Sequence, residues 1–415
     1  MMAKSAGSKE SKLVRSAVEK YLSKKEEEEQ QRKQIPYLHG DFISNILLRL
    51  PIESLISSRF VCKPWYNIVS DPLFVDAHLN RSESVLIFQV IEPTTRRLHS
   101  SSASSSPLHD RNTFAVEEKL LRADCPVSPV PPSWKRSAQG PRFFFRFMEF
   151  KHEKNDIREY KICTEGSILA ACNGLILLEN KLKKGGLLVM NPVTRKLSAL
   201  PVGTLSSDRP QSYGFAFDAS SNEYKVVHLF VDNLQYTNCE ILNLGTRTWK
   251  GVDGPSSGLI RMFQRPPVST AEALHWVPDI HPCGYIVSLG MEDETFFTTF
   301  LPNRCRAHDS LIEMDGSLCF ISHDSLDIAI WILNSLKAGS WTCNRRITKG
   351  VILDMVPLLS LRISGGLIFR RKEDGSFYVY DFELDEMRLF ETGTGSTSIH
   401  QAFAHVNSLV TWTRS

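Results

Sequence analysis

The residues of this sequence that could do chemistry are few and scattered. His281 and Cys283 stand together in the stretch HPCG and could begin a thiol or metal site, but two ligands need at least one more, and none can be assigned. Glu292, Asp293 and Glu294 could supply the carboxylate pair of a glycosidase, although such a run in a hairpin turn is usually a solvated tip. No P-loop, G-x-G-x-x-G or H-E-x-x-H motif occurs. The sequence therefore predicts no catalytic residue, no metal and no cofactor.

Composition and charge narrow the class of protein further. Lys and Arg total 49 against 46 Asp and Glu, and the first 34 residues hold the excess, so no basic surface for nucleic acid is indicated. Nine cysteines without a C-x-x-C pair favour reduced thiols, and thus the cytoplasm or nucleus. No run is apolar and long enough for a membrane span. Residues 1–34, rich in Lys, Glu, Ser and Gln, are predicted to be a disordered charged tail.

Residues 35–80 follow a helical pattern. Apolar residues from Leu38 to Leu50 fall on one helical face that Pro51 ends, and a second apolar face runs from Ile52 to Phe60. Pro64 can begin a third helix, and Asp71 can cap a fourth. A unit of about 45 residues rarely stabilises itself with one core. Its apolar residues must therefore pack against the rest of the chain or against a partner protein.

This stretch resembles an F-box. The match comprises Asp41, Ile46-Leu47, Arg49-Leu50-Pro51, Ser54-Leu55, Val61-Cys62-Lys63 and Trp65 in register, with His39 where the family usually has proline. The resemblance implies docking onto the Skp-type adaptor of an SCF ubiquitin ligase and, through it, onto the cullin scaffold. The adaptor-facing positions of the family correspond here to Leu38, Leu50, Pro51, Val61, Cys62 and Trp65.

The sequence from about residue 84 to 415 is β-patterned. Short apolar runs alternate with turn residues, and a loose motif recurs from Asn191, Asn243, Leu289, Leu333 and Asp381. A second marker, a turn residue before an apolar strand, recurs as CNGLILL, AEALHWV, DGSLCFI and SGGLIFR. A period of about 40 to 50 residues is typical of four-stranded propeller blades. We therefore predict a small all-α unit followed by an all-β propeller-like domain of about six to eight blades, an α+β multidomain chain; a β-sandwich is the alternative.

The same region resembles the F-box-associated domain, a kelch-like propeller found behind the F-box in many plant proteins. The likeness runs from CNGLILL to DGSLCFISHDSLDIAIWIL and covers about residues 165 to 390. It implies a module that recognises a substrate. A Ser- and Pro-rich segment at about 98–140 is predicted to be a flexible insertion in the first blade.

Two functions remain in competition at this level. The favoured hypothesis is a non-catalytic subunit that docks through the F-box and presents a target protein for ubiquitination. The alternative is a propeller-type enzyme or small-molecule receptor that carries an F-box for regulated turnover. For target binding we single out the loop GLIRMFQRPP with Arg261, Phe263 and Arg265, because Arg, Met and aromatic residues are enriched where proteins meet. A solvated connection is an equal alternative for this loop.

Overall fold

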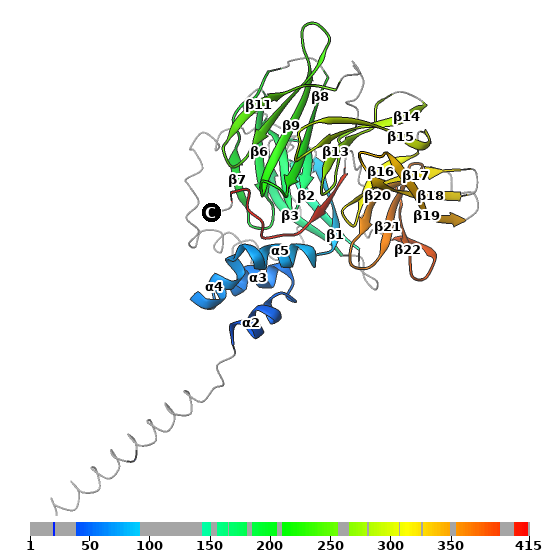
Figure 1. The fold of residues 1–415 in the computed structure, drawn as a ribbon. Coiled ribbons are helices and arrows are strands. Elements are labelled where there is room, and N and C mark those ends of the chain that lie inside the picture. The colour runs from blue at the N-terminus through cyan, green and yellow to red at the C-terminus, as the bar shows by residue number, and fades with distance from the viewer. Residues whose placement is uncertain are drawn as a thin grey trace, which may run out of the picture.

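The computed structural model describes Lys20 and residues 39–91, 143–150, 156–164, 166–180, 185–205, 210–255, 265–279, 282–306, 308–324, 327–348, 354–390 and 402–413. The elements in these residues are four helices followed by 24 strands, which form six four-stranded sheets (Figure 1). Apart from Lys20, the predicted tail lies outside the described residues, and so does the predicted insertion. No helix in the described part is both long and apolar enough to cross a bilayer.

The four helices begin and end where local chemistry requires. They are α2 (Gly40–Leu47), α3 (Ile52–Ser58), α4 (Lys63–Ser70) and α5 (Pro72–Asn80). Pro64 lies in the first turn of α4, where its missing N–H costs nothing. The Asp71 carboxylate caps α5 by accepting from the Leu73 and Phe74 N–H groups at 2.8 and 3.3 Å. We call α2–α5 the helical unit.

The strands form six blades, each of four antiparallel strands. Blade 1 holds β24 (Ala402–Val406), β1 (Ser84–Ile91), β2 (Phe143–Glu149) and β3 (Asp156–Thr164); blade 2 holds β4 (Ile168–Cys172), β5 (Leu175–Asn180), β6 (Gly186–Asn191) and β7 (Lys196–Ala199). Blade 3 holds β8 (Gln211–Asp218), β9 (Glu223–Val231), β10 (Thr237–Asn243) and β11 (Thr248–Val252); blade 4 holds β12 (Val268–Ser269), β13 (Ala273–Trp276), β14 (Cys283–Gly290) and β15 (Phe296–Cys305). Blade 5 holds β16 (Ser310–Met314), β17 (Ser317–His323), β18 (Asp327–Ser335) and β19 (Ser340–Thr348); blade 6 holds β20 (Met355–Leu361), β21 (Gly366–Arg371), β22 (Phe377–Asp381) and β23 (Glu386–Phe390).

The blades close into a ring. The first strands of successive blades contact one another in the order β4, β8, β12, β16, β20 and β24, and β24 in turn contacts β4. The fold is therefore a six-bladed β-propeller behind a small helical unit, which confirms the predicted class and rules out the sandwich. Blade 1 joins both ends of the propeller region, because β24 pairs antiparallel with β1 from Ser84 opposite Val406 to Phe88 opposite Ala402. This pairing removes the open sheet edges that an unclosed ring would expose.

The recurring sequence markers are the turns of these blades. CNGLILL and DGSLCFI place Asn173-Gly174 and Asp315-Gly316 between the first two strands, and all four residues have positive φ. Two successive positive φ values are those of the type I′ turn, which joins tightly twisted strands. The motif that recurs from Asn191, Asn243, Leu289, Leu333 and Asp381 lies at the end of the third strand of blades 2 to 6. In each of these blades one residue of the following turn has positive φ: Arg195, Arg247, Glu294, Gly339 and Asp385.

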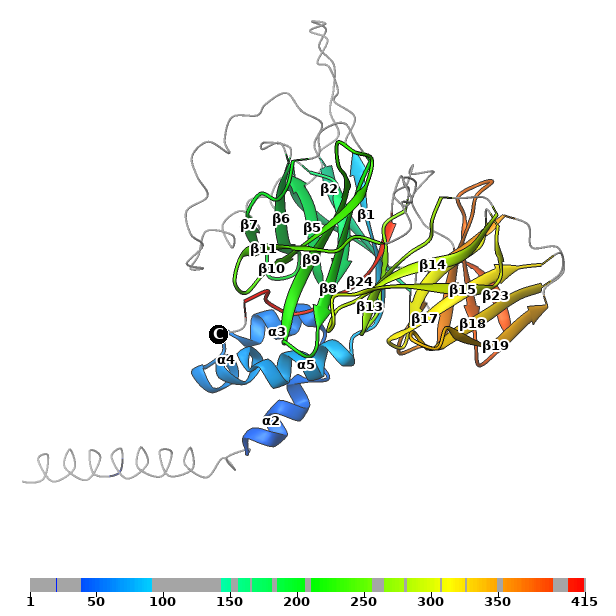
Figure 2. The same ribbon diagram turned by 45° about the horizontal axis from the view of Figure 1, so that its top comes forward.

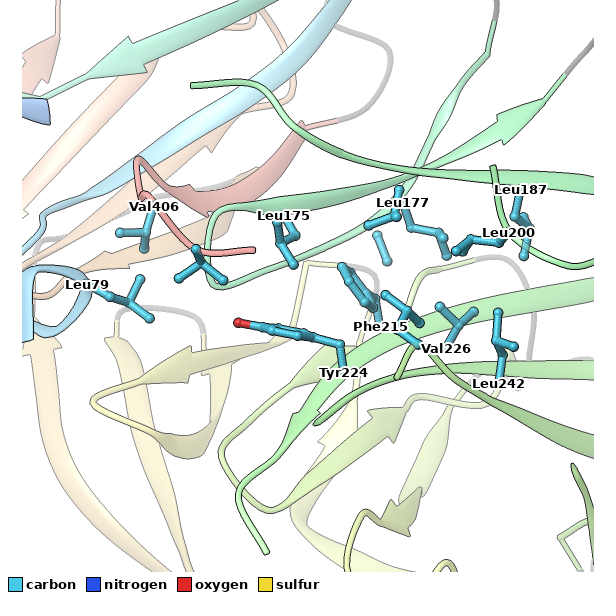
Figure 3. Close-up of a cluster of buried hydrophobic side chains, with 14 residues drawn as sticks. Leu79, Leu175, Leu177, Leu187, Leu200, Phe215, Tyr224, Val226, Leu242 and Val406 are labelled. Atoms are coloured by element: carbon cyan, nitrogen blue, oxygen red, sulfur yellow. The ribbon is translucent and has the colours of Figure 1, made fainter. Parts of the chain in front are cut away.

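The propeller core lies between blades rather than inside any one of them. Each pair of neighbouring blades encloses its own cluster of buried apolar side chains. Figure 3 shows the cluster between blades 2 and 3, where Leu177 and Leu187 face Phe215, Val226 and Leu242. A single blade cannot bury its two apolar faces, so the ring is stable only as a whole.

The helical unit lies against one face of the ring. Figure 2 shows it beside β5 to β11, with β14 to β23 farther away. We call this the helix-side face. The Glu83 carboxylate, between α5 and β1, accepts from the Ser364 N–H at 2.8 Å and the Ser364 hydroxyl at 2.9 Å in the β20–β21 turn. The first strand of each blade ends at the helix-side face and therefore begins at the opposite face of the ring. The connections that lead from one blade into the first strand of the next lie on that opposite face, which we call the far face.

Candidate functional site

The helical unit presents an apolar surface to solvent. Phe60 and Leu73 are 75% and 80% exposed. The full set of exposed large apolar side chains on this unit is Phe42, Ile46, Phe60, Val61, Tyr66 and Leu73. Six such residues on or between four short helices are more than scattered exposure usually gives, which favours a protein interface on this unit.

A cavity of about 830 Å³ opens along the middle of the ring. It is lined by first strands of the blades and includes Cys172, Arg265, Glu313 and Arg362. Arg362 donates to the Glu313 carboxylate at 3.3 Å, so these charges compensate each other. Burial raises the pKa of the Cys172 thiol to about 12, which favours its protonated form at neutral pH.

Among the described residues, the chemical groups singled out in the sequence do not lie together in one site. His281 lies outside the described residues, and buried Cys283 donates its S–H to the Tyr285 carbonyl oxygen at 3.1 Å. The carboxylate of Glu294 binds Lys225 at 3.0 Å and Lys250 at 2.7 Å. In the part of the chain that the structure describes, no three His, Cys, Asp or Glu side chains converge as metal ligands.

Comparison with known families agrees with this geometry. Residues 136–412 match the model of the F-box associated beta propeller domain, and residues 38–76 match the F-box domain. The chain belongs to the F-box-associated β-propeller family. An F-box implies binding to a Skp1-type adaptor, and in this protein the exposed apolar surface lies on the F-box helices.

Two relatives from Arabidopsis thaliana are described as F-box proteins. F-box protein CPR1 is 24% identical over 337 residues, covering 73% of this chain and 71% of that protein. Putative F-box protein At3g10240 is 27% identical over 312 residues, covering 73% and 69%. Among solved structures, TolB from Acinetobacter baumannii is 12% identical with a TM-score of 0.40, covering 63% of this chain and 62% of TolB, which is too distant to add to the assignment.

The predicted adaptor-facing residues of the F-box divide into two groups. Pro51, Val61 and Cys62 are exposed, whereas Leu50 and Trp65 are half-buried and pack onto the core of the helical unit. Leu38 lies outside the described residues. Trp65 therefore contributes to packing inside the F-box, and its proposed contact with an adaptor uses only part of its ring.

Three residues that the sequence placed on apolar helical faces, to pack against the rest of the chain or against a partner, are exposed. Phe42 and Ile46 lie on a different side of α2 from Ile43 and Leu47, which pack inward. Phe60 lies beyond the end of α3 at Ser58, so it does not share the inward face of that helix. The signal in the sequence was the four-residue spacing of Phe42 and Ile46, which makes a second apolar stripe on a helix of only eight residues.

The predicted target-binding loop is described only at its end. Arg261 and Phe263 lie outside the described residues, while Arg265 is exposed just before β12, on the far face. Its guanidinium donates from Nη1 to the Asp309 carbonyl oxygen at 3.2 Å. Arg306, exposed on the same connection as Asp309, donates from Nη1 to the His323 carbonyl oxygen at 3.3 Å. The Asp309 carboxylate accepts from the Arg306 and His323 N–H groups at 2.6 and 2.7 Å, so this region is one hydrogen-bonded network.

Proposed function

We propose that this protein is the substrate-recognition subunit of an SCF-type ubiquitin ligase. The F-box surface docks onto a Skp-type adaptor and so joins the cullin scaffold, while the propeller holds a target protein. The observation that carries this proposal is the exposed apolar surface of the helical unit, which lies on one side of a closed ring. The far face of the ring is on the opposite side from this unit. The subunit itself performs no catalysis in this scheme, and it acts in the cytoplasm or nucleus.

Charged substitution of the exposed F-box surface tests the docking half. We expect Phe60→Asp with Val61→Asp to lower adaptor affinity at least thirtyfold, because truncating central apolar residues of an interface commonly costs more than about 2 kcal/mol. Both side chains are exposed, so the fold should be kept. The measurement is a calorimetric titration of the full chain with a recombinant Skp-type adaptor.

The matched control for this titration is Leu234→Asp with Tyr236→Asp. These residues are 75% and 64% exposed on the β9–β10 loop of the far face, so they add the same charge at a comparable exposure but away from the F-box. Equal affinities of the F-box variant, the control and the wild type would contradict docking through this surface. The double variant Pro51→Ala with Trp65→Ala, by contrast, also disturbs F-box packing and needs a melting curve beside it.

Two exposed guanidiniums, those of Arg265 and Arg306, support the proposal that the target binds on the far face. Both are held by main-chain carbonyl oxygens, which fix their position without neutralising their charge. A guanidinium held in this way keeps further N–H donors for a carboxylate or a similar oxyanion. We therefore propose that the target offers an acidic group to this network, next to the loop that carries Arg261 and Phe263.

Neutral substitution at the two arginines is the test. We expect Arg265→Gln with Arg306→Gln to capture at least tenfold less target than the wild type, while adaptor affinity stays unchanged. The amount of captured target is measured by quantitative mass spectrometry. Arg247→Gln is the control, because Arg247 is exposed and its guanidinium also donates to a carbonyl oxygen, that of Ala199 at 2.6 Å. Arg261→Ala with Phe263→Ala tests the neighbouring loop separately. Unaltered capture by both far-face variants would remove this region from the target site.

A further inference from the structure

The buried core of the F-box includes two residues of the propeller. The F-box residues of this core are Leu47, Ile52, Leu55, Val69 and Phe74. Val193, in the turn after β6, and Leu409, after β24, belong to the same cluster and are 9% and 2% exposed. In Figure 1 the chain that follows β24 runs between the helices and the blades. The small helical unit thus completes its core with side chains from blade 2 and from the chain that leaves blade 1.

The contact continues from the F-box into the propeller core. Leu79, in the last helix of the F-box, lies in the cluster between blades 2 and 3 together with Val406 and Val410. Figure 3 shows Leu79 beside Val406 and near Tyr224. We call residues 407–410 the C-terminal segment. Its two apolar side chains point into different clusters, since Leu409 is buried with the F-box and Val410 with the blades.

One buried amide holds this arrangement in place. The side chain of Asn191 donates from Nδ2 to the carbonyl oxygens of Ser408 at 3.0 Å and Val410 at 2.9 Å, on either side of Leu409. Its Oδ1 accepts from the N–H groups of Val193 at 2.9 Å and Thr194 at 3.1 Å. Asn191 is fully buried, and its side-chain amide makes its hydrogen bonds to other groups of the protein. It positions both propeller residues that enter the F-box core.

A second contact fixes the C-terminal segment to the first turn of blade 2. The Ser408 hydroxyl donates to the Asn173 carbonyl oxygen at 2.7 Å. Gly174 follows with φ of +85°, and a Cβ at this glycine would lie 2.1 Å from the Ser408 Oγ. Only glycine allows this close approach. The segment is therefore seated only when β24 is paired with β1 and blade 2 is formed.

We infer that Asn191, Val193 and Leu409 are positioning residues of the adaptor-binding unit, so that closing the propeller ring is what orders the F-box. A chain whose ring has not closed lacks the Leu409 side chain in the F-box core, and Asn191 loses the two carbonyl acceptors of the C-terminal segment. Such a chain cannot hold α3, α4 and α5 in their packed arrangement. Ring closure then decides whether the adaptor surface is formed, and it also fixes the far face relative to that surface. This inference uses the proposed adaptor docking for one of its two readouts only.

Hydrogen exchange of the full chain tests the inference without any partner. We expect Leu409→Ala to raise the exchange rates of amides in residues 52–80 at least tenfold, because local opening becomes easier when a core side chain is lost. The matched control is Leu289→Ala, since Leu289 is also fully buried but lies between blades 3 and 4 with no F-box residue in its cluster. The control should leave residues 52–80 at the wild-type rate.

A second pair of variants distinguishes two roles of the Asn191 side chain: its contact with the C-terminal segment and its capping of the turn after β6. Asn191 and Asn243 both end a third strand and both cap the following turn, with the Asn243 Oδ1 accepting from the Gly245 N–H at 2.8 Å. Asn243 has no contact with the C-terminal segment among its described hydrogen bonds. Asn191→Ala should therefore raise exchange in residues 52–80 at least tenfold, and Asn243→Ala should not.

Adaptor titration supplies the second readout. Leu409→Ala and Asn191→Ala should each lower adaptor affinity at least tenfold, whereas the two controls keep it. F-box exchange rates equal to wild type in both variants would overturn the inference. If the wild type itself fails to bind the adaptor but exchange rises as expected, the proposed function fails and the inference stands. Should Leu409→Ala not fold, the milder Leu409→Val is used, and unchanged exchange in that folded variant overturns the inference equally.

Discussion

Deleting residues 401–415 should abolish cooperative folding of the propeller. The deletion removes β24, which is the first strand of blade 1 and contacts both β4 and β20. It also removes Val406, Leu409 and Val410, all at most 5% exposed. The ring would then expose a sheet edge on β1 and lose buried side chains from two apolar clusters, a loss beyond the usual marginal stability of a domain. Circular dichroism during heating should show no cooperative transition.

The matched control for this deletion is a chain that ends at Thr413, which keeps every strand and every buried residue of the C-terminal segment. It should melt as the wild type does. A soluble chain that lacks residues 401–415 and still melts cooperatively would show that blade 1 can hold the ring with three strands. That result would contradict the importance assigned here to the pairing of β24 with β1.

Replacing Lys225 by methionine should lower the free energy of unfolding by about 3–5 kcal/mol, the usual cost of removing one member of a buried ion pair. The Lys225 side chain is 7% exposed, and its ammonium lies 2.9 Å from the Asp218 carboxylate and 3.0 Å from that of Glu294. It also donates to the Met291 carbonyl oxygen at 2.8 Å. Because Asp218 belongs to blade 3 and Glu294 to blade 4, the variant leaves buried charge unpaired between two blades.

The acid dependence of this network has a defined sign. Burial raises the pKa of the Asp218 carboxyl, but hydrogen bonds from Lys225, Ser221 and Ser220 lower it more, so the net pKa lies below its ordinary value. Glu294 follows the same pattern with Lys250 and Lys225. A carboxyl whose pKa is lower in the folded state adds stability above its unfolded pKa, near 4 for these groups, and this is lost as the pH falls. Lys225→Met should reduce that acid dependence.

Urea unfolding at pH 7 and at pH 3 measures both effects, because the acid loss occurs mainly below the unfolded pKa. Lys250→Met is the control, because Lys250 binds the same Glu294 carboxylate at 2.7 Å but is 72% exposed. An exposed ion pair contributes little, so this variant should lose less than about 1 kcal/mol. Similar losses for the two lysines would show that the burial of Lys225 does not set its contribution.

Much of this architecture could be predicted from short-range sequence signals. Pro64 and the Asp71 cap determine where two helices begin, because proline and a capping carboxylate act within one turn of chain. Asn173-Gly174 and Asp315-Gly316 determine tight hairpins, since their positive φ values are a local property of the residues. The recurrence of such turns predicted a propeller, and the register of the F-box motif predicted its family.

Only the tertiary structure decided which apolar residues are buried and against what. Periodicity did not separate Phe42 from Ile43 or reveal that Phe60 lies past a helix end, because exposure depends on elements far away in the chain. The number of blades likewise required the structure, since blade 1 takes β24 from more than three hundred residues after β1. The F-box motif contains no sign of Leu409, yet this residue completes the F-box core. Local chemistry fixes turns and caps, whereas a shared core forms only when distant segments meet.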